Sequence, residues 1–548
     1  MIIKANYIDI KNSNIFPASI LVENKKIISI TKIEELLSTF ILPGFIDAHI
    51  HIESSMMIPS QFAKIAVTHG TVATVSDPHE IANVLGEKGI EFMLSNASKV
   101  NFNFNFGVSS CVPATTFETS GSTLDSKIVD KLLHNPNLNH LGEVMAFPSV
   151  INGDKEILEK IESAKKLNIP IDGHAPNLRG KDLKKYIRSG ITTDHESSSY
   201  EEAKEKLDLG MKILIREGSA AKNFDALSPL IDKYYKKLMF CSDDKHPNDL
   251  LKGHINSLVL KAVKKGYDLF NILQIACINP INHYNLDLGQ LQIGDKADFI
   301  EIQDLTSFKI IRTVIAGEEV YIDGKNKINN VDVEPINKFN TKPKKIEEFI
   351  FKSDCDTIEV IQAIDHELFT KELKYHTKED GIFSVDLSQD ILKIAVINRY
   401  EDKKPAVSFV NGFGLKKGAI ASCVAHDSHN IIVVGCSDEE ICKAVNLIIE
   451  SKGGISAVDT NSSLHLPLDI AGIMSSDDAF KVASLYEEID NFSKKDLGST
   501  LSSPFMTLSF MALLVIPEIK LSDKGLFNGR EFHFISGCIK DRKNKIDS

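Results

Sequence analysis

Between residues 40 and 245, short apolar runs alternate with segments whose apolar residues recur every three or four positions. The first pattern predicts β-strands and the second predicts helices. Strands are expected at 41–51, 71–77, 101–110, 140–148, 169–175, 191–196, 211–219 and 238–244, each followed by a helix. Eight consecutive strand–helix units predict a closed (β/α)8 barrel. A doubly wound open sheet is the competing layout, but no GxGxxG motif follows the first strand.

The flanking regions follow other patterns. Residues 1–41 and 286–333 read as short strands separated by turns, and we expect them to form one small β-domain beside a barrel of residues 42–285. Residues 334–350 have the composition of a linker. Residues 351–548 combine strand-like runs such as "NIIVVGC" with helical runs such as "DEEICKAVNLIIESKG", which predicts an additional C-terminal α+β domain. The predicted fold class is therefore α/β, with a barrel and two further domains.

The first barrel strand contains an unusual alternation in the stretch "FIDAHIHIE" (45–53). Asp47, His49, His51 and Glu53 fall on one parity, and aliphatic residues fall on the other. Successive side chains of a strand point to opposite faces, so one face is apolar and the other offers a set of possible ligands.

Polar residues also stand near the ends of other predicted strands. In a barrel the C-terminal strand ends meet on one rim, so these side chains are expected to converge. They are His49, His51, Glu143, His174, His195 and Asp243. Nitrogen and oxygen donors of this kind suit divalent metals, and two ions share six ligands if one carboxylate bridges them. Glu143 is the predicted bridge, because it comes from the fourth strand, between the two halves of the ring.

Each of these residues also has a plainer interpretation. An HxH motif alone is more often a half-buried strand, and single residues such as His174 or His195 are more often turn or core histidines. Asp243 and Asp244 alone would be read as the start of a turn or helix. The coincidence at five strand ends is what favours a metal site.

Composition narrows the class of protein. The chain has 548 residues and a net charge of −12, which argues against general binding to nucleic acid or a membrane surface. The N-terminus lacks the apolar segment of a signal peptide, and the most apolar run, 504–519, is too short to span a membrane, so we interpret it as buried core. Eight scattered cysteines without a CxxC pair predict unpaired thiols in a reducing cytoplasm.

Several longer motifs resemble the amidohydrolase superfamily and, within it, the adenine deaminase family. "PGFIDAHIH" resembles the opening metal motif of the superfamily, and "GDKADFI" resembles the strand that returns to its side domain. Seven further stretches resemble sequence blocks of the adenine deaminase family and follow the order of that family. They are "DPHEIANVLG", "GEVMAFPSVINGD", "IDGHAPNLRGKDL", "TTDHESSSYEEA", "SDDKHPNDLLKGHI", "VAHDSHNIIVVG" and "LPLDIAGIMS". The resemblance covers nearly the whole chain.

This resemblance implies a cytoplasmic enzyme of purine salvage that converts adenine and water to hypoxanthine and ammonia. It implies two divalent ions, manganese or iron, on the six residues named above, and a homodimer. Two such ions can hold a hydroxide at neutral pH for attack on the ring. Asp243 is the expected proton shuttle to the leaving amine, and Glu143 is expected to bridge the ions.

A second group of residues is assigned less directly. His79, Glu80, Asp244 and His246 lie on the predicted rim and are expected to contact the substrate or its water, although 77–80 also suits a turn that begins a helix. In the last domain, "AHDSHN" contributes His426, Asp427 and His429. With the family resemblance, we expect this loop to reach across the barrel mouth as a lid; alone it would read as a solvated loop.

Two other functions remain open from the sequence. A cyclic-amide hydrolase of the same superfamily, such as a dihydroorotase or hydantoinase, would place a bridging lysine on the fourth strand, where this chain has none near Glu143. A protein that binds metal structurally and acts through interactions is the alternative outside enzymes. Ammonia release from adenine separates these possibilities.

Overall fold

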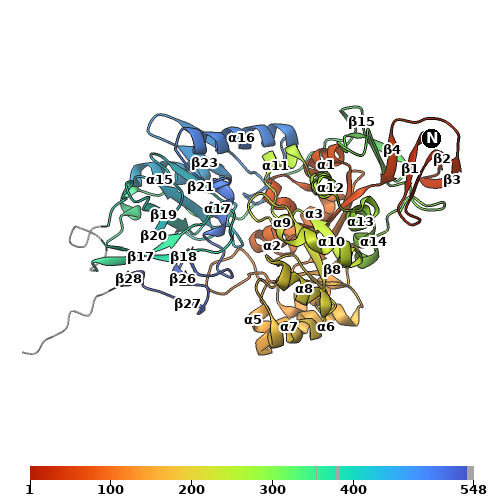
Figure 1. Ribbon diagram of the computed structural model, residues 1–548. Helices are drawn as coiled ribbons and strands as arrows, with labels where there is room; N and C mark the ends of the chain where they lie inside the picture. The colour runs from red at the N-terminus through yellow and green to blue at the C-terminus, as the bar shows by residue number, and fades with distance from the viewer. Residues whose placement is uncertain (353–354, 377–382, 540–548) are drawn as a thin grey trace, which may run out of the picture.

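The computed structural model describes residues 1–352, 355–376 and 383–539. Parts of the predicted C-terminal domain, at 353–354, 377–382 and 540–548, therefore lie outside the described residues. A barrel occupies the centre of the molecule, with a small sheet at one end and the C-terminal region at the other (Figure 1). The boundaries proposed above for these parts stay a prediction.

Eight parallel strands form the barrel. They are β5 (Phe45–Ile50), β6 (Thr71–Ser76), β7 (Asn103–Val108), β8 (Leu138–Val144), β9 (Ile171–Gly173), β10 (Thr193–Asp194), β11 (Lys212–Arg216) and β12 (Leu238–Cys241). Strands β5 to β9 pair in order, as do β10 to β12. At one seam the Thr192 N–H donates to the Ile171 carbonyl at 2.9 Å, and at the other the Asp243 N–H donates to the His49 carbonyl at 2.9 Å. The ring is thus closed, and the predicted barrel is confirmed.

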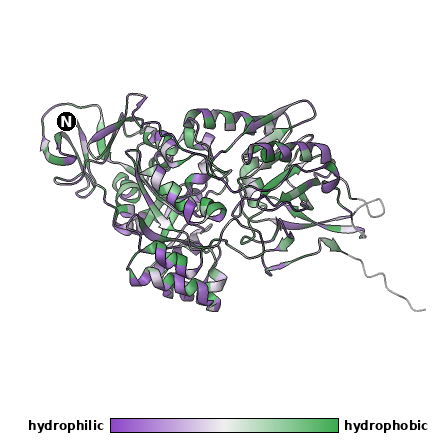
Figure 2. Cartoon of the chain, turned by 180° about the vertical axis from the view of Figure 1, so that it is seen from behind, coloured by the Kyte–Doolittle hydropathy of each residue, from purple (hydrophilic) through white to green (hydrophobic). Residues whose placement is uncertain are grey.

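Helices cover the outside of this ring. They include α1 (Pro59–Ala66), α2 (His79–Leu85), α3 (Glu87–Ala97), α4 (Ser126–Leu133), α6 (Lys155–Lys166), α7 (Gly180–Arg188), α8 (Tyr200–Asp208), α11 (Pro247–Lys252) and α12 (Ile255–Lys264). Helix α6 illustrates why they form: the Asp154 side chain caps its first turn, and Ile157, Ile161 and Ala164 share one buried face. Figure 2 shows hydrophilic and hydrophobic residues side by side on these helices.

The two ends of the barrel region contribute to one eight-stranded sheet. Its order is β16–β15–β14–β13–β4–β1–β2–β3. The strands are β1 (Ile2–Asp9), β2 (Asn14–Glu23), β3 (Lys26–Lys32), β4 (Phe40–Pro43), β13 (Phe299–Ile302), β14 (Ile310–Ile315), β15 (Glu318–Ile322) and β16 (Lys325–Asn326). The single first strand expected at 41–51 is therefore two strands in two sheets. The break falls at Gly44, where an added Cβ would lie 2.3 Å from Val72 Cγ1.

The C-terminal region has its own sheet, in the order β18–β17–β20–β19–β22–β21–β23–β24. Its strands are β17 (Thr357–Gln362), β18 (Lys371–His376), β19 (Leu392–Ile397), β20 (Ala406–Asn411), β21 (Ala419–Ser422), β22 (Ile431–Gly435), β23 (Ile455–Val458) and β24 (Ser463–Leu466), with helices α15 (Asp438–Ser451), α16 (Ala479–Lys495) and α17 (Pro504–Phe510). Helix α16 packs beside α11 of the barrel (Figure 1). Helix α17 is fully buried, so its part of the run at 504–519 is core, as expected.

The prediction that every cysteine is unpaired is wrong. Cys355 and Cys538 form a disulfide, with their Cα atoms 5.9 Å apart. The pairing of β17 with β28 (Cys538–Ile539) brings these distant residues together, which the spacing of the sequence does not reveal. The other six cysteines are free. Among the described residues, no helix is long and apolar enough to cross a membrane.

Candidate active site

The six predicted ligands come from five strand ends on one rim of the barrel. His49 lies in β5 and His51 just after it, and Glu143 lies near the end of β8. His174 and His195 directly follow β9 and β10, and Asp243 follows β12. All six side chains are buried. The strand register places them together, because parallel strands of a barrel end on the same side.

Glu143 lies between the histidines of opposite sides of the ring. Its Oε1 is 3.1 Å from Nε2 of His51 and 4.0 Å from Nε2 of His49. Its Oε2 is 2.7 Å from Nδ1 of His174 and 3.3 Å from Nε2 of His195. Each carboxylate oxygen thus faces a different pair of imidazoles, which is the arrangement that a bridging ligand requires.

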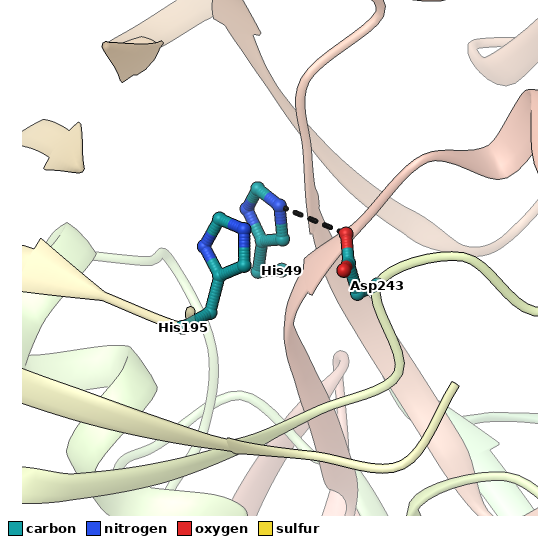
Figure 3. A group of neighbouring side chains, drawn as sticks. All are labelled: His49, His195 and Asp243. Carbon is teal, nitrogen blue, oxygen red and sulfur yellow. Dashed lines mark ion pairs between the residues drawn. The ribbon is translucent and has the colours of Figure 1, made fainter. Parts of the chain in front are cut away.

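Asp243 approaches the same centre from the closing seam of the barrel. Its Oδ1 is 3.4 Å from Nε2 of His49 and 3.2 Å from Nε2 of His51. The rings of His49 and His195 stack with centroids 4.0 Å apart, and Asp243 lies at the edge of this stack (Figure 3). The Asp243 backbone takes a φ of 54°, a conformation that Asp adopts more readily than most residues.

The donor atoms fit divalent metal ions. Several groups of three residues offer ligand atoms within 4.8 Å of one another; they include His49–His195–Asp243, His49–His51–Glu143 and Glu143–His174–His195. Within the described part of the chain, Nε2 of His49 and Nε2 of His174 are buried without a hydrogen-bond partner. A buried polar atom without a partner is costly, and a bound cation would satisfy it.

Arg216 and Glu196 belong to this site, although the sequence analysis did not single them out. Arg216 Nη1 lies 2.5 Å from Asp243 Oδ2, and its Nη2 donates to Glu196 Oε2 at 3.2 Å. Burial by itself would raise the pKa of Asp243, but the guanidinium and the rings of His49 and His51 outweigh burial and hold it well below its usual value. Asp243 is therefore ionised at neutral pH, with Oδ2 on Arg216 and Oδ1 facing the centre.

A network beneath the site fixes Glu143. Its backbone N–H donates to Oδ2 of Asp77 at 3.0 Å, and the Ser109 hydroxyl donates to Oδ1 at 2.9 Å. The Asp77 carbonyl lies 3.0 Å from Nδ1 of His51, which leaves Nε2 of that ring facing the centre. Gly142 makes room for the Asp77 carboxylate beside the Glu143 N–H, because a Cβ at position 142 would lie 2.2 Å from Asp77 Oδ2.

Three of the four predicted substrate contacts line the cavity above the centre. Nδ1 of His79 lies 3.7 Å from Oε1 of Glu143. Glu80 is the next residue, in the first turn of α2. Asp244 accepts a hydrogen bond from Ser54 at 2.5 Å, and burial raises the pKa of its carboxyl group. His246 lies instead against the Tyr486 hydroxyl of α16 and is outside the residues that line the cavity.

The predicted lid loop contacts the barrel through Glu80. One oxygen of this carboxylate pairs with Nδ1 of His426 and the other with Nε2 of His429. Burial favours the neutral form of His426, but Glu80 and then Asp244 outweigh it and raise the pKa of His426 to about 9. Nε2 of His426 lies 3.6 Å from Asp244. The ion pair thus joins the C-terminal region to the barrel next to the predicted metal ligands.

The cavity combines polar and apolar walls. Its free volume is about 30 Å³, which is room for water only, so a larger ligand requires the surrounding side chains to move apart. The polar wall includes Glu143, Asp243, His79, Glu80 and Asp427. The apolar wall consists of Met145 from the barrel and Leu368, Phe510 and Leu513 from the C-terminal region.

Comparisons with known proteins agree with the motifs. Residues 40–320 match the model "Amidohydrolase family", and residues 367–533 match "Adenine deaminase C-terminal domain". The chain is 59% identical to "Adenine deaminase" of Sulfurovum sp. (strain NBC37-1), over 98% of this chain and all of that protein. It is 52% identical to "Adenine deaminase" of Borreliella afzelii, over 97% of this chain and 99% of that protein, and 48% identical to the protein of that name in Salinibacter ruber, over 98% and 99%. The chain belongs to the adenine deaminase family of the amidohydrolases.

Proposed function

We propose that this protein converts adenine and water to hypoxanthine and ammonia. The single observation that carries the proposal is the position of Glu143, whose two oxygens face the β5 histidines and the His174–His195 pair separately. The full-length relatives named adenine deaminase support the choice of substrate.

We propose two divalent ions as cofactors, held by His49, His51, Glu143, His174, His195 and Asp243. When bound, such ions supply Lewis acidity and lower the pKa of water to about 7, so that a nucleophile is available at neutral pH. Manganese and iron are the proposed metals, since both accept imidazole and carboxylate donors.

The residues of the chain then supply positioning and proton transfer. Attack at C6 of the purine places negative charge on the ring, so a ring nitrogen gains a proton, and the departing amine gains another. Asp243 is the proposed carrier, because Oδ1 faces the centre while Arg216 holds Oδ2. His79 and Glu80 line the cavity within reach of the substrate. Apolar walls limit the access of bulk water to the reacting atoms.

The remaining proposals concern the context of the enzyme. The loop of His426, Asp427 and His429 is proposed to act as a lid that completes the cavity, since two of these residues line it and His429 holds Glu80. We also propose a cytoplasmic homodimer that acts in purine salvage.

The test is ammonia release by purified protein loaded with manganese or with iron. Adenine turnover with no hydrolysis of dihydroorotate or hydantoin supports the proposal. Turnover of a cyclic amide instead of adenine would favour the second enzyme class, and inertness towards both would favour a non-catalytic metal protein. The Glu143→Gln variant is the matched control, because it keeps the side-chain shape and weakens the bridging ligand.

A further inference from the structure

Asp427 is a buried carboxylate with an unsatisfied oxygen in the wall of the cavity. The residue is 3% exposed and is contributed by the C-terminal region rather than by the barrel. Its Oδ1 lies 3.8 Å from Nε2 of His79. Over the described residues, its Oδ2 is buried without a hydrogen-bond partner.

The loop that carries Asp427 is fixed on both sides. His426 and His429 both pair with Glu80, and the backbone N–H of His426 donates to the Ser509 hydroxyl at 3.2 Å. The backbone N–H of His429 donates to the carbonyl of Ala425 at 2.8 Å, which closes one turn around Asp427. These contacts hold the Asp427 carboxylate in the cavity wall.

A buried carboxylate oxygen without a donor is costly, so a donor is expected to come with the ligand. Among the C-terminal residues that line the cavity, Leu368, Phe510 and Leu513 are apolar. The free nitrogen of His426, Nε2, lies 3.6 Å from Asp244 and makes no hydrogen bond to Asp427. Adenine carries N–H donors at two places only, the amino group on C6 and the five-membered ring. Its other ring nitrogens are acceptors, which a carboxylate repels.

Geometry decides between these two donors. The amino group leaves from C6, so it must face the centre at Glu143 and Asp243. The ring of His79 lies between Asp427 and Glu143. Its Nδ1 is 3.7 Å from Oε1 of Glu143, and its Nε2 is 3.8 Å from Oδ1 of Asp427. A purine whose C6 faces the metal ligands directs its five-membered ring away from them, towards the C-terminal wall.

We propose that Asp427 accepts a hydrogen bond from the ring N–H of the five-membered ring of adenine. This inference rests on the proposed function and extends it to the selection of substrate. The enzyme then prefers the free base, because purines that lack this N–H leave the Asp427 oxygen buried and unpaired. The C-terminal region thus contributes a substrate-binding residue to a site whose metal ligands all come from the barrel.

The test compares adenine with its oxazole analogues, in which a ring oxygen replaces the N–H of the five-membered ring. Adenine and its two analogues all carry the amino group, and their sizes are nearly equal. The variants are Asp427→Asn and, as a matched control, Asp323→Asn, which lies on an exposed turn of the side sheet where φ is 47°. We measure kcat/KM and KM with ammonia release, and metal content for every variant.

Wild-type enzyme is expected to prefer adenine by about ten- to a hundredfold, the range for a hydrogen bond to a charged group. Asp427→Asn is expected to lower kcat/KM for adenine by a similar factor and to leave the value for the analogues nearly unchanged, with metal content intact. Asp323→Asn should change neither value.

Equal losses on both substrates, or no loss on adenine, would overturn the inference. Should Asp427→Asn not fold, the preference of the wild type decides, and equal kcat/KM values for adenine and both analogues would also overturn it. Absence of adenine turnover by the wild type would remove the proposed function and this inference with it. Turnover without selectivity would remove the inference alone.

Discussion

The contact between Glu80 and the lid loop offers a quantitative test of how the C-terminal region docks on the barrel. Glu80→Gln keeps the size of the side chain and removes the charge that faces His426 and His429. The buried ion pair raises the pKa of His426 from 6.5 to about 9, and Glu80 is the largest contributor after burial itself. We therefore expect the variant to dock its loop less stably.

The size of the effect follows from the pKa of His426. The difference between 6.5 and about 9 corresponds to about 3 kcal/mol of interaction with the charged ring. Asp244 and Asp427 share in that stabilisation. A hydrogen bond to a charged group is worth about 1.5–3 kcal/mol, so we expect about 2 kcal/mol from Glu80, roughly a thirtyfold change in the opening equilibrium. Since the pair is fully buried, solvent screening does not reduce this value.

Hydrogen exchange measured by mass spectrometry on peptides that cover residues 424–430 is the suitable assay. A chain of several domains does not unfold in two states, whereas local exchange reports the opening of this loop directly. We expect exchange there to be roughly thirtyfold faster in Glu80→Gln, with no change in the β1–β2 hairpin. Glu488→Gln, on the exposed side of α16, is the control. Equal protection in both variants would refute the proposed role of the pair.

The same ion pair predicts a pH dependence. Because the folded pKa of His426 lies above its ordinary value, the stabilisation is complete below pH 6.5 and is lost as pH rises through about 9. After correction for intrinsic exchange, the wild-type loop should open more readily between pH 7 and pH 10. The variant should lack most of this dependence, and a flat wild-type profile would contradict the assignment.

Two further substitutions test the contacts that support the proposed metal ligands. Arg216→Met leaves Glu196 and Asp243 buried without their cation, which should cost about 3–5 kcal/mol and lower the melting temperature of the metal-free protein by about 10 °C in calorimetry; an unchanged transition would contradict this. Gly142→Ala places a Cβ against Asp77 and should weaken metal affinity by roughly 10–100-fold in equilibrium dialysis, because the partner of the Glu143 backbone is displaced. Unaltered affinity would show that the support is dispensable.

The barrel was predictable because its signal is local and repeated. Each of the eight strands is a short apolar run followed by an amphipathic helix, and each barrel strand overlaps the range expected for it, although the first expected range also includes β4 of the side sheet. The rule that functional groups stand at strand ends places His49, Glu143 and His174 in one group from the sequence alone. The same rule applies to Arg216, which ends the apolar strand β11. A guanidinium does not bind a metal ion, so the pattern of metal donors does not include it.

Contacts between distant parts of the chain were not predictable from periodicity. Glu80 and His426 are 346 residues apart, and neither segment carries a pattern that specifies the other. The disulfide between Cys355 and Cys538 has the same character, since it depends on a strand pairing across 183 residues. The division of 41–51 into β4 and β5 depends on the packing of Gly44 against Val72, which an apolar run does not reveal.

The central claim, that Glu143 joins two metal ions, is tested most directly by anomalous diffraction from crystals of the manganese-loaded protein. The account predicts two peaks about 3.5–4 Å apart, both bonded to the Glu143 carboxylate, one beside His49 and His51 and the other beside His174 and His195. A single peak, or two peaks with Glu143 bonded to only one of them, would contradict it.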